Sequence, residues 1–317
     1  MNKGSLIEEV YKKHKMLKMK NTLLTFLLII PSIIYAQDEE ELEKEPLKKD
    51  KKGFYSGIYV GSLFANKNTA GLYDGYGYDF NGNKNNFANS FMFRKIIIEY
   101  GGGNGQPDRI AQTLNVNSGD WAFDESDMPV NLKYNPSFSV GLQNRYCINN
   151  RDALILNINA SKLTVNGNFT IITRNAQAIS GQLTNNIKTF SITGGEQRIM
   201  TQLGYQRVLG DNDKLNAFVE FGAIMTMAKF EKNAVQINNL NIDLTTFYNV
   251  QGYETYRAKN LTGIGFGVFG GLGLMLTSSP KWTIQVVYNP SIEKINIGNP
   301  RKYSIQNTLG LRAYYNL

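Results

Sequence analysis

From residue 53 onward the chain alternates between apolar and polar residues with a period of two, and no helical period is sustained. The alternation is clearest in five segments: 154–160, 215–227, 264–276, 282–288 and 305–317. Alternation of this kind is typical of β-strands whose two faces meet different surroundings. In the third segment, the face opposite the apolar residues consists of glycines: Gly263, Gly265, Gly267, Gly271 and Gly273.

The strands that this pattern predicts are long, about 15–20 residues, whereas strands of globular proteins usually have about 5–6 residues. Strands that cross a membrane need about 9–11 residues, so these segments are long enough to cross and to project beyond it. We expect ten strands, at 54–65, 71–80, 87–100, 135–148, 153–172, 187–209, 214–236, 261–278, 282–297 and 302–317.

The connections alternate between tight and long ones. Turn-forming residues occupy 149–152, 210–214 and 278–281, and the long connections are roughly 101–134, 174–186 and 237–260. Outer-membrane barrels have short turns on one side and long loops on the other. The pattern therefore predicts an all-β fold for residues 53–317, a transmembrane antiparallel up-and-down β-barrel of about ten strands (roughly 8–14) with an even number.

The first 36 residues have the pattern of a signal peptide. Lys18 and Lys20 precede the apolar run 23–34, and a small residue, Ala36, stands where we expect cleavage. The run is shorter than the ~20 residues of a transmembrane helix. Met19 is an alternative first residue of the translated chain. Residues 37–52 are acidic first and then lysine-rich, which predicts a solvated periplasmic tail, with a docking segment for a partner as the alternative.

The net charge of the whole chain overstates how basic the exported part is. The sequence has 34 Lys and Arg against 26 Asp and Glu; residues 1–36 hold six of the basic and two of the acidic ones, so the remainder carries +4. Nucleic-acid binding needs basic residues clustered on one face, so we expect no nucleic-acid partner. The chain has one cysteine, Cys147, which excludes an intrachain disulfide and a multi-cysteine metal site. Its position in the strand alternation places it on the inward face and predicts a buried side chain.

Three stretches together carry a resemblance to a known class. They are the signal peptide ending in Ala36-Gln37, the segment GFYSGIYVG at 53–61 and the terminal LGLRAYYNL at 309–317. They resemble outer-membrane β-barrel proteins of Bacteroidota-type bacteria, over the chain from about residue 53. The resemblance implies a Gram-negative cell outer membrane, contact with outer-membrane lipid and insertion by the barrel-assembly machinery. The chain departs from that class at its last residue, Leu317, where an aromatic is usual.

Histidine is absent after the predicted cleavage site, because the only one is His14. Outer-membrane phospholipases, lipid A deacylases, palmitoyl transferases and omptin-type proteases resemble one another in using a histidine base. A serine–lysine mechanism stays open, although no motif singles out either residue. We therefore expect no enzyme activity and no cofactor.

Charged residues within the predicted strands fall on the face away from lipid, since a Lys or Arg on the lipid face costs about 2–4 kcal/mol near the midplane. A narrow barrel fills its interior with paired charges, whereas an open pore uses them to select ions. We favour the filled interior, in which the glycine face leaves room for side chains such as Arg312, coupled to Glu220. The predicted lumen-facing charges are Lys95, Glu99, Arg145, Arg198, Glu220 and Arg312.

The loop NSGDWAFDESDMP gathers four acids: Asp120, Asp124, Glu125 and Asp127. Ca²⁺ takes oxygen ligands from such clusters, although the spacing is not that of an EF-hand, and a solvated outer loop is the alternative. The aromatic tip of this loop, 121–123, is interpreted as either a contact patch or a lumen plug.

These patterns favour a non-enzymatic outer-membrane barrel with a filled or narrow lumen. Such a protein would act as a structural or interaction component, through its long outer loops or its tail, on a protein partner that the sequence does not identify. The alternatives are a pore for small solutes, a component of a secretion assembly, and a secreted soluble ligand-binding barrel.

Overall fold

The computed structural model describes residues 53–78, 83–175, 184–210, 212, 214–248, 255–257, 262–279, 281–297 and 302–317. The predicted signal peptide (1–36) and tail (37–52) lie outside the described residues. All the described residues belong to one compact unit, Lys49–Leu317.

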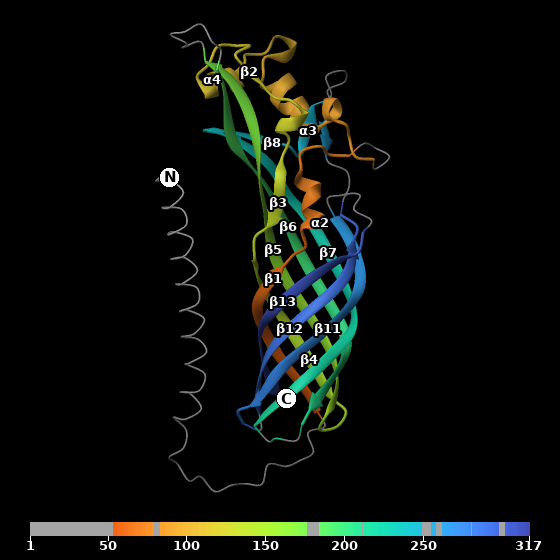
Figure 1. The fold of residues 1–317 in the computed structure, drawn as a ribbon. Helices are drawn as coiled ribbons and strands as arrows, with labels where there is room; N and C mark the ends of the chain where they lie inside the picture. Colours follow the sequence, from red (N-terminus) through yellow and green to blue (C-terminus); the bar gives the residue numbers. More distant parts are fainter. Residues whose placement is uncertain are drawn as a thin grey trace, which may run out of the picture. The chain divides into compact units, whose positions relative to one another are not determined.

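Eight long antiparallel strands form a closed barrel in the described part of the chain (Figure 1). Each strand pairs with its neighbours in the ring, and β1 and β13 close it along a register that runs from Tyr55 opposite Asn316 to Phe64 opposite Asn307. The ring therefore has the up-and-down order expected from the sequence. In ring order the strands are β1 (Gly53–Phe64), β4 (Ser137–Cys147), β5 (Asp152–Asn175), β6 (Thr184–Leu209), β7 (Leu215–Ile237), β11 (Thr262–Thr277), β12 (Trp282–Ile295) and β13 (Ser304–Asn316).

The predicted all-β barrel is confirmed, and eight of its strands match the prediction to within three residues at each end, but two predicted strands are wrong. Segment 71–80 contains the 3₁₀ turn η1 (Gly71–Tyr73). Segment 87–100 contains η2 (Phe87–Asn89), α3 (Phe91–Phe93) and the π-helical η3 (Arg94–Glu99). The physical reason is helix capping, because the Ser90 hydroxyl accepts a hydrogen bond from the Phe93 N–H. None of the described helices has the length and hydropathy that crossing a bilayer requires.

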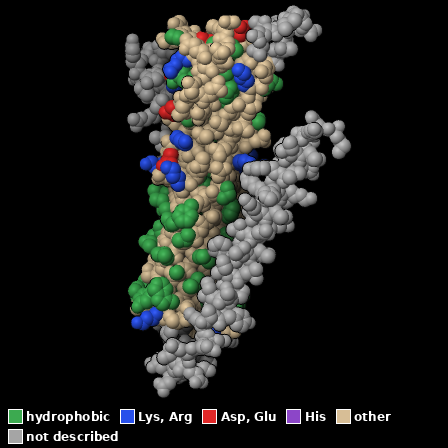
Figure 2. Space-filling view, turned by 90° about the vertical axis from the view of Figure 1, so that its left-hand side faces the viewer, with side chains coloured by type: hydrophobic (Ala, Val, Ile, Leu, Met, Phe, Trp, Pro, Cys, Tyr) green, Lys and Arg blue, Asp and Glu red, His purple; other side chains and the backbone are tan. Residues whose placement is uncertain are grey.

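The outer surface of the barrel is apolar in its lower part and polar above it. On β5 the outward side chains are apolar from Leu154 to Ala160 and become polar at Lys162, and on β7 they change at Lys229. Figure 2 shows hydrophobic side chains gathered on the lower half of one face, with charged ones above. Exposed aromatic residues mark both edges of this apolar belt, as in transmembrane barrels: Phe54, Tyr146, Trp282 and Tyr315 at the short-turn end, and Phe64, Phe138, Phe266 and Tyr303 at the other.

Above the belt, β5, β6 and β7 continue upward and support a folded region that we call the outer cap, residues 65–78 and 83–136 (Figure 1). A continuous apolar core joins the cap to these strands, and in it the Phe123 and Phe169 rings meet edge to face, with centroids 6.2 Å apart. The long connection predicted at 101–134 is therefore folded. Besides η1, η2, α3 and η3, the cap contains α2 (Lys67–Ala70), η4 (Gly103–Gly105), α4 (Arg109–Leu114), β2 (Trp121–Ala122), η5 (Glu125–Asp127) and β3 (Val130–Tyr134).

Short strands extend the sheet beside the cap. β2 and β3 pair with β5, and β8 (Leu240–Asp243) pairs with β7. β9 (Thr246–Tyr248) and β10 (Thr255–Arg257) pair only with each other among the described strands.

Candidate functional site

The barrel interior holds two layers of buried charge, and the lower layer is centred on Glu220 and Arg312. Arg312 Nη1 and Nη2 donate to Glu220 Oε2 and Oε1 over 2.7 and 2.8 Å, and both side chains are almost fully buried. β11 and β12 separate the two parent strands in the ring, so the pair crosses the lumen. Asn289 Nδ2 and Gln206 Nε2 also donate to the carboxylate, which is thus fully hydrogen-bonded. This two-point geometry is the strong form of an ion pair.

The glycine face of β11 makes room for this pair. A Cβ atom on Gly271 would lie 2.7 Å from Glu220 Cγ, closer than real Cβ contacts allow. Gly270, the preceding residue, points the other way, and a Cβ there would have its closest neighbour, the Glu220 carbonyl oxygen, at 3.9 Å. The predicted role of the glycines therefore holds at Gly271, although the side chain that it accommodates belongs to Glu220.

The upper layer is centred on Glu196 and Arg198 of β6, both fully buried. Arg198 Nε donates to Glu196 Oε1, and the hydroxyls of Tyr73 and Tyr134 donate to Glu196 Oε2, each over 2.9 Å. Arg198 Nη2 also donates to Thr69 Oγ1 over 3.0 Å. Three of these partners belong to the cap, so the cap is bound to the barrel wall through this layer.

The segment from Asn66 to Tyr73 is seated in the upper mouth of the barrel (Figure 1). At one end the backbone N–H of Asn66 donates to Gln306 Oε1 of β13 over 2.7 Å. At the other end the Tyr73 ring stacks on Phe230 of β7, with centroids 5.3 Å apart. Because these contacts reach β13 and β7, which two strands separate in the ring, the segment crosses the upper mouth of the barrel. We call residues 66–73 the plug.

Arg145 also lies inside the barrel, where its guanidinium contacts a thioether sulfur and an aromatic ring. Its Nη1 lies 3.3 Å from Met275 Sδ, and its guanidinium lies 5.8 Å from the centroid of the Tyr55 ring. Cys147 is buried on the same inner face, packed with Tyr55, Ala153 and Tyr314. Of the predicted lumen-facing charges, four are buried side chains of barrel strands: Arg145, Arg198, Glu220 and Arg312.

The prediction is wrong for Lys95 and Glu99, because they lie in η3 of the cap and not in a strand. Four residues apart on that helix, they form an ion pair of 2.6 Å between Lys95 Nζ and Glu99 Oε2. Conversely, Glu196 and Glu293 are buried in the lumen and were not predicted. Glu196 lies two residues before Arg198 and therefore on the same face of the strand. That spacing is the sequence signal that indicates a lumen-facing Glu196.

The four acids of the predicted cation loop do not converge on one point. Asp124 caps η5 and accepts hydrogen bonds from the Ser126 N–H and hydroxyl, which hold the pKa of its carboxyl below the usual value. Asp127 is buried, where it accepts from the Asp124 N–H and from the Thr170 hydroxyl. Asp120 accepts from Asn117 Nδ2, and Glu125 is exposed. Among the described residues, no three His, Cys, Asp or Glu side chains are close enough to hold a metal ion, so the Ca²⁺ prediction gains no support.

The aromatic residues of the same loop belong to the cap core. Phe123 is buried in it. The Trp121 indole N–H donates to Asp108 Oδ2 over 2.9 Å, and Asp108 in turn caps α4 through the Ala111 N–H. Phe123 therefore packs in the cap core and not in the barrel lumen, whereas Trp121 and Ala122 are half-buried, so the contact patch stays a prediction.

No protein-family model and no characterised protein matches the sequence. Solved structures similar to this chain are outer-membrane or surface proteins. Ail, the attachment invasion locus protein of Yersinia pestis, is 13% identical with a TM-score of 0.32, covering 84% of this chain and 99% of that one. Neisserial surface protein A is 9% identical with a TM-score of 0.33, covering 84% of this chain and 97% of that one. The outer membrane protein OprG from Pseudomonas aeruginosa is 10% identical with a TM-score of 0.34, covering 84% of this chain and 94% of that one. Identities this low carry no residue-level correspondence.

Proposed function

We propose that this protein is a non-enzymatic outer-membrane β-barrel whose lumen does not conduct and whose outer cap binds a partner at the cell surface. The observation that carries the proposal is the double closure of the lumen. The Glu220–Arg312 pair bridges it at the lower level, and the plug fills it at the upper level. A porin instead keeps a continuous aqueous channel.

The membrane location rests on the outer surface. An apolar belt bordered by aromatic residues is what a bilayer requires of a barrel, and a soluble barrel of this size would leave that belt in water. The short turns between β4 and β5, β6 and β7, and β11 and β12 lie at the end of the barrel where β1 begins and β13 ends, opposite the cap (Figure 1). In an outer membrane the short turns face the periplasm, so the cap faces outward.

The remaining parts of the proposal follow from the sequence. A signal peptide exports the chain, the barrel-assembly machinery inserts it, and the resemblance of residues 53–61 and 309–317 supports an origin in Bacteroidota-type bacteria. The cap supplies the interaction surface, because it is a folded region that shares an apolar core with β5, β6 and β7 and is held above the belt by these three strands.

Two measurements test the proposal. Purified protein run on a gel unheated and boiled should show a mobility shift, because a closed transmembrane barrel resists detergent until it is heated. Reconstituted into planar bilayers, it should give no single-channel steps. Recovery in the soluble fraction without a heat shift would contradict the membrane location, and discrete conductance steps would favour the small-solute pore instead.

A further inference from the structure

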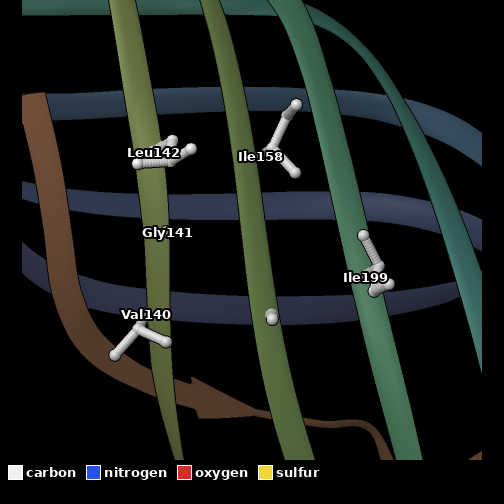
Figure 3. Close-up of a pocket in the computed structure, with 6 residues that line it drawn as sticks. Val140, Gly141, Leu142, Ile158 and Ile199 are labelled. Carbon is white, nitrogen blue, oxygen red and sulfur yellow. The ribbon is translucent and has the colours of Figure 1, made fainter. Parts of the chain in front are cut away.

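The lipid-facing surface carries an apolar groove that crosses β4, β5 and β6. Figure 3 shows Val140 and Leu142 on one strand, Ile158 on the next and Ile199 on the third. The lining residues are Val140, Gly141, Leu142, Ile158, Ala160 and Ile199.

The floor of this groove is a small residue placed between larger ones. Ala160 on β5 pairs with Val140 on one side and with Ile199 on the other. Side chains directly opposite on neighbouring strands lie about 5 Å apart on the same face, so the missing volume at Ala160 leaves a notch between two branched side chains. The groove belongs to the apolar belt, where the surrounding medium is hydrocarbon.

A cluster of lysines lies immediately above the groove. Lys162 follows Ala160 by two residues on the same face of β5, so it is about 7 Å higher along the strand. Across the sheet Lys162 pairs with Gln197, and Gln197 pairs with Lys229. Lys232 pairs with Gly195 one step higher. All three lysines are exposed, and we call Lys162, Lys229 and Lys232 the lysine cluster.

The Glu231 carboxylate pairs with one lysine of the cluster and leaves the cluster positively charged. Glu231 Oε2 lies 3.0 Å from Lys162 Nζ, and Gln197 Nε2 donates to Glu231 Oε1. Gly195 provides the space for this arrangement, since a Cβ there would lie 3.3 Å from Lys232 Cγ and 3.8 Å from Glu231 Cβ. Three lysines and one glutamate leave a net charge of +2 at the edge of the belt.

We infer that the groove and the lysine cluster together bind one phosphorylated lipid of the outer leaflet, with an acyl chain in the groove and its phosphate on the lysines. The inference rests on the proposed membrane location. Charge complementarity argues for a phosphate headgroup, because about 1 kcal/mol is gained for each lysine near an anionic membrane surface. The notch below the lysines argues for an acylated ligand, since free phosphate has no group to place there.

Native mass spectrometry of the full chain in detergent tests this inference. The protein is titrated with phosphatidylglycerol or with phosphatidylcholine of the same acyl chains, and the fraction with one bound lipid is measured. Wild type should prefer phosphatidylglycerol, and Lys162→Gln and Lys229→Gln should each lower that preference about fivefold. Ala160→Leu fills the notch and should weaken the binding of both lipids several-fold.

Matched controls keep the outcome specific. Lys294→Gln removes a lysine at the same edge of the belt but on β12, across the ring, and should leave the preference unchanged. Ala217→Leu enlarges another outward alanine, near the short turns, and should leave lipid binding unchanged. Glu231→Gln raises the local charge and should strengthen the preference.

Two results would overturn the lipid site: equal binding of both lipids by wild type, or an equal effect of Lys294→Gln and Lys162→Gln. The heat shift of each variant on a gel reports that its barrel is intact. Wild type without a heat shift would refute the membrane location and the lipid site together, whereas a heat-modifiable wild type without lipid preference would refute the lipid site alone.

Discussion

Glu220 and Arg312 face each other across the lumen and share two hydrogen bonds, so the carboxylate of β7 and the guanidinium of β13 form one unit. Removing one partner leaves a buried charge uncompensated, which costs about 3–5 kcal/mol. We therefore expect Glu220→Gln and Arg312→Met to destabilise strongly when single and by much less than their sum when combined. Urea unfolding of the barrel in detergent micelles measures this coupling.

The control for this cycle is the pair between Lys84 Nζ and Asp74 Oδ2, 2.7 Å apart in the cap, in which the lysine side chain is half exposed and the aspartate is largely buried. Lys84→Ala should change the free energy of unfolding by about 1 kcal/mol or less, because solvent screens the half-exposed ammonium and the Tyr76 N–H still donates to Asp74. Additive effects of the Glu220 and Arg312 substitutions would show that the bridge is not an energetic unit.

Gly271 and Gly270 are adjacent, but an added methyl group should destabilise the barrel only at Gly271. Gly271→Ala should destabilise by about 1–3 kcal/mol, because its new methyl group would displace the Glu220 side chain. Gly270→Ala has open space and should stay within about 0.5 kcal/mol. Unfolding midpoints of the two variants measure the difference, and equal midpoints would contradict the proposed contact.

We expect the two lumen layers to block conduction in series. Replacing plug residues 67–73 by a glycine–serine linker removes Thr69 and Tyr73 but leaves the Glu220–Arg312 bridge in place. We expect neither this variant nor Glu220→Ala with Arg312→Ala to conduct alone, and the combination to give single-channel steps in planar bilayers. Conductance from the linker variant alone would mean that the lower layer does not close the lumen.

The cap core should unfold separately from the barrel. Phe123→Ala removes a buried ring that packs against Phe169, which costs about 3–5 kcal/mol. We expect limited proteolysis to cut this variant within residues 83–134 while its barrel keeps its heat shift on a gel. Trp282→Phe, on the lipid face, is the control and should stay resistant, and loss of the heat shift by Phe123→Ala would show that the cap and the barrel fold as one unit.

The sequence predicts the barrel strands well, because one apolar face in contact with lipid forces strict alternation over many residues. It fails at 87–100, where aromatic and β-branched residues resemble a strand. The helix there is specified by the Ser90 cap and by Met92 and Ile96, four residues apart and both buried in the cap core. That signal is only a few residues long and depends on tertiary contacts.

The alternation of inward and outward residues along a strand indicates which charges enter the lumen, as for Arg198 and Arg312. It does not indicate which residues they contact there. Tyr73 and Tyr134 reach Glu196 from the connection between β1 and β4. Their approach depends on how that connection folds back into the barrel mouth, and no local pattern encodes it. The lysine cluster was missed for a related reason, since its members are distant in sequence and are brought together by strand register.

β5, β6 and β7 run without interruption from the short turns to the cap, and they pair with one another along most of that length. A force that pulls the cap away from the cell would act nearly parallel to these strands. It would load many hydrogen bonds at once in shear, instead of peeling them apart one by one. A partner bound to the cap, as we propose, would therefore be held against a tension that would stretch a simple surface loop.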